Sequence, residues 1–318
     1  MKRLLIVFAL PFVSLMVNAQ DDLDKIVDIH SAKAEEATPA DSAKVENPWK
    51  YGGNFSVTFS QVSLTNWVAG GENSISGNAG VLLTANYQKG KNKWDNTLDL
   101  GYGLTRQGGE DITKKNEDKI DFSSQFGRKA SKHWYYSALF GFKSQFDKGY
   151  NYPDVDNVIS DFLAPAYLLT SVGMDYRPSE KFTVLLSPIT GRMTIVNVKE
   201  LSDAGAFGVD PGKTTRTEMG GFVKVNYKDS FFEDKLGVRS RLELFSSYLD
   251  KPQNIDVNWE IAFDLKLGNY ITARFQTIMI YDDDSKIGVD TNDDGEIDKQ
   301  VAKLQIKELL GIGFSYKF

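Results

Sequence analysis

The chain has 318 residues, a length that allows one large domain or two ordinary ones. Its formal net charge is −6, from 37 Lys and Arg against 43 Asp and Glu, so it lacks the basic balance of a nucleic-acid-binding protein and we expect no such partner. It contains no cysteine and two histidines, which excludes disulfides, cysteine-ligated zinc, iron–sulfur clusters and thiol catalysis.

The first 19 residues have the pattern of a secretory signal peptide. Lys2 and Arg3 precede an apolar run over 4–17, and small residues at 17–19 offer a cleavage site. The run is shorter than the roughly 20 residues that a membrane-spanning helix needs, so an uncleaved anchor is the less favoured interpretation. The segment 20–47 is rich in Asp, Glu, Ala and Ser and has no aromatic residue, which predicts a disordered periplasmic tail.

From residue 48 onward the chain predicts one repeated element. Apolar residues recur with a period of two, most clearly over 257–267, where Val257, Trp259, Ile261 and Phe263 alternate with polar neighbours. This is the period of a β-strand with one apolar face. We expect twelve strands, over 50–61, 74–88, 93–106, 117–128, 133–147, 166–177, 181–197, 215–228, 235–248, 254–267, 270–282 and 303–318.

The connections between these strands alternate between short and mostly long. Short polar turns follow every second strand, and the tightest is Gly268-Asn269. The other connections are longer, with one exception at 249–253. Short turns at one end and longer loops at the other are typical of outer-membrane barrels. The long connections are 62–73, 107–116, 148–165, 198–214 and 283–302.

Alternation alone does not decide which face points inward, because a soluble barrel or sandwich would bury its apolar face. Export, an even strand count, short turns at one end, and a polar face of Gly, Ser, Thr and Asn favour the inverse arrangement. Aromatic residues beside the short turns, such as Trp94, Trp134 and Tyr270, suit the headgroup level of a membrane. We therefore predict an all-β fold over 48–318, a closed antiparallel transmembrane β-barrel of about twelve strands. Since hydrocarbon offers no partner for a free sheet edge, the first strand should pair with the last.

Two stretches carry a resemblance to known families. The C-terminal GFSYKF, which ends at Phe318, resembles the signal by which outer-membrane barrels reach their assembly machinery. The stretch Phe59 to Gly80, with the YDDD run over 281–284 and the same C-terminus, resembles a Bacteroidetes-type outer-membrane barrel family catalogued as a domain of unknown function, DUF3078. The resemblance would cover 48–318. It implies the barrel fold and the bacterial outer membrane, with the bilayer and the barrel-assembly machinery as partners, and it implies no catalytic residues.

Charged residues fall on the face that should line the lumen. Basic and acidic groups lie on roughly opposite walls of a closed cylinder, which could create a transverse field that orders a polar solute. Alternatively, the acidic residues among the basic ones neutralise them and fill the interior with ion pairs. The lumen candidates are Asp95, Asp99, Asp121, Lys224, Arg239, Arg241, Glu243, Glu260, Asp264 and Arg274.

The last long loop holds a stretch, DTNDDGEID, with calcium-loop spacing. Asp290, Asn292, Asp294, Glu296 and Asp298 stand at positions 1, 3, 5, 7 and 9 of such a loop, with a glycine at position 6. Position 12 is Val301 and not the usual glutamate, so the prediction is weak Ca²⁺ binding, with a solvated acidic loop as the alternative. The protein should need no cofactor.

We expect a monomeric barrel that acts as a narrow pore or facilitator for small polar solutes. The alternative is a structural or interaction barrel that displays loops, of which 148–165 has an amphipathic patch that could form a lid. A membrane-embedded lipid hydrolase is less favoured, because the barrel's one histidine, His133, lies in a short turn on the expected periplasmic side. We expect no enzymatic activity.

Overall fold

The computed structural model describes residues 47–64, 72–108, 112–291 and 298–318. The expected signal peptide, and the expected tail except for Asn47, lie outside the described residues.

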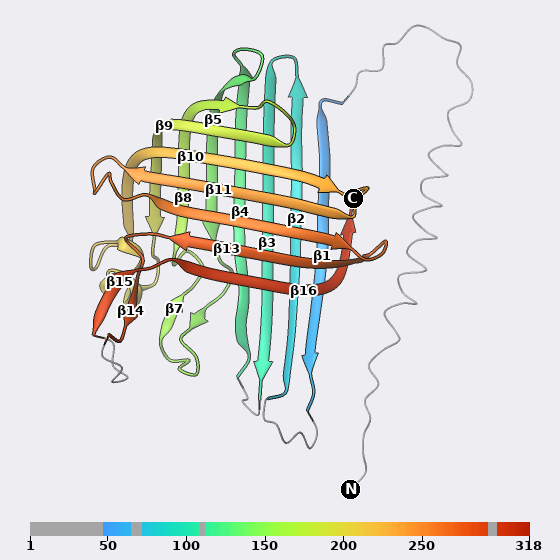
Figure 1. Cartoon of the computed structure of the whole chain (residues 1–318). Coiled ribbons are helices and arrows are strands. Elements are labelled where there is room, and N and C mark those ends of the chain that lie inside the picture. Colours follow the sequence, from blue (N-terminus) through green and yellow to red (C-terminus); the bar gives the residue numbers. More distant parts are fainter. Residues whose placement is uncertain (1–46, 65–71, 109–111, 292–297) are drawn as a thin grey trace, which may run out of the picture. The chain divides into compact units, whose positions relative to one another are not determined.

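Twelve strands form a closed barrel in which every pair of neighbours is antiparallel (Figure 1). The fold class expected from the sequence is therefore confirmed, and each strand lies within three residues of its expected bounds. The barrel strands are β1 (Trp49–Val62), β2 (Ser74–Lys89), β3 (Asn92–Gln107), β4 (Lys114–Lys129), β5 (Trp134–Ser144), β8 (Ala166–Tyr176), β9 (Phe182–Ile195), β10 (Thr215–Phe231), β11 (Leu236–Ser247), β12 (Asp256–Lys266), β13 (Ile271–Tyr281) and β16 (Gln305–Lys317).

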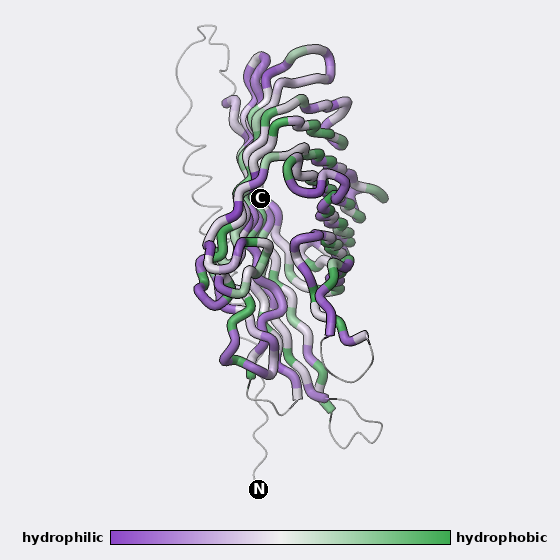
Figure 2. The backbone as a smooth tube through the Cα atoms, turned by 90° about the vertical axis from the view of Figure 1, so that its left-hand side faces the viewer, coloured by the Kyte–Doolittle hydropathy of each residue, from purple (hydrophilic) through white to green (hydrophobic). Residues whose placement is uncertain are grey.

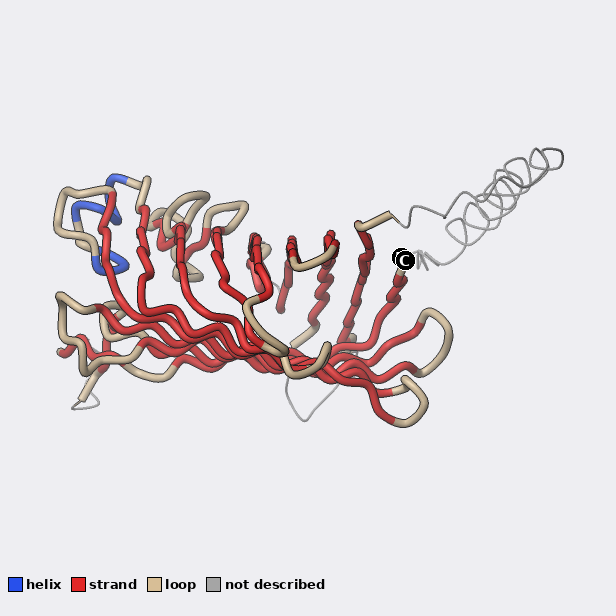
Figure 3. The backbone as a smooth tube through the Cα atoms, turned by 90° about the horizontal axis from the view of Figure 1, so that it is seen from above, coloured by secondary structure: helices blue, strands red, loops and turns tan. Residues whose placement is uncertain are grey.

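The long connections contain short elements that the sequence pattern did not predict. Two small hairpins, β6 (Gly149–Tyr150) with β7 (Val158–Ser160) and β14 (Lys286–Val289) with β15 (Lys299–Ala302), stand apart from the barrel sheet. Helix α2 (Lys199–Asp203) and the 3₁₀ turn η1 (Ala206–Gly208) follow β9, at the end of the barrel where other long loops gather (Figure 3). Such elements are too short to show a period. No helix among the described residues has the length and apolar character needed to cross a membrane.

The barrel wall is apolar outside and polar inside. On β12, for example, the side chains of Trp259, Phe263 and Leu265 are exposed, and the alternate positions Glu260 and Asp264 point into the lumen. The strands accordingly alternate between hydrophobic and hydrophilic residues along the chain (Figure 2).

The buried side chains are also the inverse of those in a soluble protein, with polar groups inside and apolar groups outside. Asp121, Thr190 and Lys224 are 5%, 0% and 7% exposed, whereas Leu310 on the outer face is 79% exposed. Burying charged groups in the centre of a soluble protein while exposing large apolar ones to water would be unfavourable on both counts. The wall thus suits a bilayer, in which acyl chains cover the outer face.

Aromatic side chains gather beside the short turns. The ring centroid of Trp49 lies 5.2 Å from that of Tyr87 and 5.8 Å from that of Trp94. Beside the next short turn, the rings of Trp134 and Tyr176 are 4.9 Å apart. Aromatic side chains with polar edges favour the headgroup level, so these contacts mark one membrane interface.

The barrel is flattened into two walls of strands that face each other (Figure 3). The wall of β1–β4 runs across the wall of β10–β16, and at one corner β16 turns to run along β1 (Figure 1). The pairing of β1 with β16 is confirmed but short, because only Asn54–Thr58 pair with Gly313–Lys317. At the end of that seam, the backbones of Gly53 and Phe318 exchange hydrogen bonds of 3.0 and 3.1 Å.

Candidate functional site

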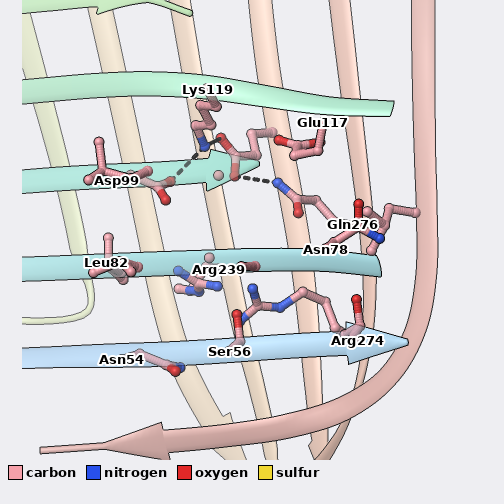
Figure 4. Close-up of a pocket in the computed structure, with 18 residues that line it drawn as sticks. Asn54, Ser56, Asn78, Leu82, Asp99, Glu117, Lys119, Arg239, Arg274 and Gln276 are labelled. Atoms are coloured by element: carbon pink, nitrogen blue, oxygen red, sulfur yellow. Dashed lines mark hydrogen bonds and ion pairs between the residues drawn. The ribbon is translucent and has the colours of Figure 1, made fainter. Parts of the chain in front are cut away.

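The lumen holds a polar cavity between the two walls (Figure 4). Its volume is about 90 Å³, room for only a few water molecules. Polar lining residues come from β1–β4 on one wall and from β11–β13 on the other: Ser56, Asn78, Asp99, Glu117 and Lys119 on the first, and Arg239, Glu260, Arg274 and Gln276 on the second.

Arg241 joins the two walls. Its Nη2 lies 2.8 Å from a carboxylate oxygen of Asp121 on β4 and 2.8 Å from one of Glu260 on β12. Lys119 extends this network, because its Nζ lies 2.6 Å from Asp99 and 3.5 Å from Glu260. Opposite charges are therefore in contact across the lumen and neutralise one another.

A second crossing centres on Glu243 of β11. Its carboxylate lies 2.5 Å from Nζ of Lys143 on β5 and 3.7 Å from Nζ of Lys224 on β10. Lys224 also donates a hydrogen bond of 3.2 Å to Oγ of Ser123 on β4. Two ammonium groups thus share one carboxylate in the middle of the barrel.

Two arginines at the cavity share a single carboxylate. Arg239 Nη2 lies 3.1 Å and Arg274 Nε 2.6 Å from the oxygens of Asp264. Their guanidinium groups lie beside Ser56 of the facing wall (Figure 4). This part of the cavity therefore carries an excess of positive charge.

Apolar side chains fill another part of the lumen. Leu139, Leu185, Phe222 and Phe245 form a buried cluster with Leu169, from β5 and β8–β11. Arg192 stacks on this cluster with its guanidinium carbon 4.1 Å from the ring centroid of Phe245. The described side chains therefore occupy much of the interior, and the lumen is not a wide channel.

The short-turn end of the lumen has its own ion pairs. Arg177 contacts the carboxylates of Asp175 and Asp95 and stacks 5.6 Å from the ring centroid of Tyr135. Gln125 donates a hydrogen bond of 2.9 Å to the fully buried Asp175.

At the long-loop end, Arg216 ties three connections together. Its Nη1 donates to the carbonyl of Gly208 at 3.1 Å and lies 2.8 Å from Asp284, and its Nη2 lies 3.0 Å from Asp250. Gly208 has φ of +79°, and a Cβ there would lie 2.5 Å from that Nη1. Nearby, Lys251 donates to Asp283 at 2.9 Å, and this hydrogen bond lowers the pKa of the Asp283 carboxyl.

These connections also have a small apolar core of their own. Ala164, Val196 and Val209 are buried, and Leu201 and Phe207 pack against them. The connections after β5 and β9 therefore form an ordered structure rather than separate loops. In the predicted amphipathic patch over 158–163, Ile159 and Phe162 are exposed.

The ten predicted lumen residues all take part in the inward-facing contacts described above. From the sequence we did not predict Lys119, Lys143 and Arg177, each of which forms an ion pair with at least one of these ten residues. We did not predict the apolar cluster either. For Lys119 a signal existed, because it precedes Asp121 by two residues and must share its face. His133 lies in the short β4–β5 turn, 6.2 Å from the ring of Tyr176.

The calcium loop stays a prediction. Asn292, Asp294 and Glu296 lie outside the described residues, and of the two other candidates Asp298 accepts hydrogen bonds from the backbone and hydroxyl of Thr291. Asp290 also has a partner. Within the described ranges, no three residues of metal-binding type lie together.

A search of curated proteins finds no match. The model of a family described as "Protein of unknown function (DUF3078)" matches residues 59–150, from the end of β1 to β6. The match supports the resemblance stated above over this part of the chain. The closing region around 281–284 and 313–318 lies outside it, and the Bacteroidetes attribution stays a prediction.

Among solved structures, the chain is similar to the COG4313 outer membrane channel from Pseudomonas putida F1, with 11% identity, 89% of this chain and 100% of that chain covered, and a TM-score of 0.38. It is also similar to the translocator domain of the autotransporter NalP from Neisseria meningitidis, with 11% identity, coverages of 96% and 98%, and a TM-score of 0.32. The toluene transporter TodX of P. putida matches with 10% identity, coverages of 88% and 94%, and a TM-score of 0.27.

Proposed function

We propose that this protein is an outer-membrane β-barrel that acts as a narrow pore or facilitator for small polar solutes. The observation that carries the proposal is the cavity of about 90 Å³, which is lined by charged and polar side chains inside an apolar-walled barrel. Its size restricts passage to small solutes, and its charges favour hydrated ones. The ion pairs of Arg241 form the constriction that such solutes must pass.

Single-channel conductance in a planar bilayer tests the proposal. The wild-type protein should give small, reproducible open levels. The double substitution R241A/D121A removes both partners of a cross-lumen pair, so it should enlarge the open level without leaving a single charge unpaired. The matched control is S56A, which changes a lining residue outside the ion pairs. If the wild-type protein and the double variant both insert into the bilayer and neither conducts, the result would contradict the pore.

A second candidate is a non-conducting barrel that displays loops to partners. The ion pairs that join opposite walls and the ordered long-loop end favour it, because both restrict an axial path. The conductance experiment separates the two candidates. In both cases we propose no enzymatic activity. A lipase assay on the purified protein in vesicles would contradict this if it detected lipid hydrolysis that substitutions in the protein abolish.

The proposed outer-membrane location includes assembly of a monomer through the C-terminal strand. The signal-peptide pattern and the terminal Phe318, whose backbone pairs with Gly53, support it. Deleting Phe318 should reduce the amount of folded barrel in the outer-membrane fraction of a bacterial host. Equal amounts of the deleted and the complete protein would contradict recognition of the C-terminus.

A further inference from the structure

We propose that the half-paired seam between β1 and β16 is a lateral entrance to the lumen cavity, and that the cavity binds the head of a long-chain carboxylate whose acyl chain lies in that entrance. The proposal rests on the barrel lying in a bilayer. It does not depend on axial conduction through the pore proposed above.

The first observation is where pairing between the two strands stops. β1 pairs with β2 along its whole length, and β16 pairs with β13 from Gln305 to Phe314. Between β1 and β16, however, the register ends at Thr58 and Gly313. Figure 1 shows the reason, because β16 crosses the wall of β1–β4 before it turns to run along β1.

The open part of the seam lies at membrane depth. Tyr316 marks the interface, since its ring lies 6.3 Å from that of Tyr270 beside a short turn. Gly313 is three residues away, about 10 Å along a strand and about 7 Å along the membrane normal at a tilt of roughly 45°. The apolar band of such barrels is about 25 Å tall, so the last pair lies within it. Exposed apolar side chains continue there, at Phe59, Ile306, Leu310 and Ile312.

Close contact at Gly313 fixes the bend of β16. A Cβ on Gly313 would lie 2.2 Å from the carbonyl oxygen of Val57 and 2.7 Å from Cγ2 of Thr58. The close approach of the two backbones therefore requires glycine at this position. The partial seam is thus specified by the sequence.

Side chains at the opening depart from the polar pattern of the lumen. Ile278, Ile280 and Leu309 share the inward face of β13 and β16 with Arg274 and Gln276. Leu309 lines the cavity itself.

The facing wall at this level is polar. On it, Asn116 donates a hydrogen bond of 3.0 Å to Ser76, and Asn78 lines the cavity. One apolar and one polar wall together fit an apolar chain that carries a polar head.

The charge and the size of the cavity indicate the chemistry of the head group that it binds. The carboxylates of Asp99, Glu117 and Glu260 each contact a lysine or arginine, while Asp264 is the one ion-pair partner that Arg239 and Arg274 have among the described residues. At the end of the cavity where the two guanidinium groups face one carboxylate, the local positive charge favours an anion, and a guanidinium group binds a carboxylate through two parallel hydrogen bonds. A cavity of about 90 Å³ has room for that head but not for a long chain, which must then lie in the seam.

A binding titration tests the site. Wild-type protein in lipid nanodiscs should bind the fluorescent probe dansyl-undecanoate, and the uncharged dansyl-undecanol should bind about tenfold more weakly or less. R274Q should weaken binding of the carboxylate by about tenfold, the effect of losing one hydrogen bond to a charged group. The matched control is R177Q, which removes an ion-paired lumen arginine that does not line the cavity and should leave binding unchanged.

Equal affinity of R274Q and wild-type protein for the carboxylate would overturn the site, as would equal affinity of the acid and the alcohol. A preference for an alkyl phosphate over the carboxylate would overturn the identity of the head. If R274Q does not give a folded barrel, judged by heat-modifiable migration on a gel, R239Q and the charge-preserving R274K replace it, and R274K should keep binding within a few-fold.

Cysteine pairs test the entrance, because the natural chain contains no cysteine. V57C/F314C places cysteines at register partners and should form a disulfide on mild oxidation. Q61C/L310C places them where partners would stand if the seam were paired throughout, and should stay reduced and react with a maleimide. Equally complete oxidation of both pairs would mean that the seam closes along its length and would overturn the entrance, whatever the conductance experiment gives.

Discussion

The guanidinium of Arg241 holds two carboxylates that come from opposite walls of the barrel. Asp121 is 5% exposed, and Arg241 is its one ion-pair partner among the described residues. Removing one partner of a buried pair is more destabilising than removing both, because the remaining charge stays desolvated.

We therefore expect R241M to lower the free energy of unfolding by about 3 kcal/mol, the lower end of the range for buried pairs, since the arginine is partly hydrated. Urea unfolding in phospholipid vesicles, followed by tryptophan fluorescence, measures it. The control R128M changes an exposed arginine at the end of β4 and should have little effect. R241M/D121L should recover part of the loss, and a double variant less stable than R241M would contradict this account.

Glu308 is an acidic side chain on the outer face of β16, between Ile306 and Leu310 and opposite Thr277 of β13. A carboxylate that faces acyl chains is unfavourable in a depth-dependent way. E308L should therefore raise the urea midpoint in vesicles, and E308Q should raise it less. A lower midpoint for E308L would mean that Glu308 has a favourable partner and does not face lipid.

At the scale of elements, the two glycines of β16 differ in the space around them. A Cβ on Gly313 would overlap the backbone of β1, whereas one on Gly311 would make ordinary contact with Thr58 at 3.5 Å. We expect G313A to reduce the folded fraction severalfold and G311A to fold like the wild type, with heat-modifiable migration after refolding into vesicles as the measurement. Normal folding of G313A would mean that the strands can separate at this point without loss.

The strands could be predicted because each carries its own signal. The period of two over 257–267 places β12 correctly without knowledge of any other strand. Elements such as α2 and β6 carry no such signal, because they are held by contacts with other loops, including the cluster around Val196 and Val209. The bend of β16 was equally invisible, since Gly311 and Gly313 fit the alternation of a straight strand.

At the scale of the whole molecule, alternation predicts which residues face inward but not which of them meet. Arg241 and Asp121 are in contact because the two walls cross at their positions, and that depends on tilt and flattening, which no local pattern encodes. Leu139 and Phe245 show the same limit, because alternation places them inside without indicating that they form one cluster.

The inverted wall predicts how the folded protein partitions. Heat-modifiable barrel should move with the detergent-rich phase when a nonionic detergent solution is warmed past its cloud point, because exposed residues such as Trp259 and Leu310 need an apolar cover. A soluble, cysteine-free control protein should stay in the aqueous phase. Folded barrel that remains in the aqueous phase without detergent would contradict the membrane assignment.

The crossing of the two walls has a consequence for biogenesis. Lys119 forms an ion pair with Glu260, Lys143 with Glu243, and Lys307 with Glu117. These partners are 141, 100 and 190 residues apart in the chain. Lys119 has a nearer partner in Asp99 of the neighbouring strand β3, but the ion pairs of Lys143 and Lys307 form only when the last third of the chain arrives. Insertion should therefore proceed as a single late event, and the cell must shelter the unfinished chain until then.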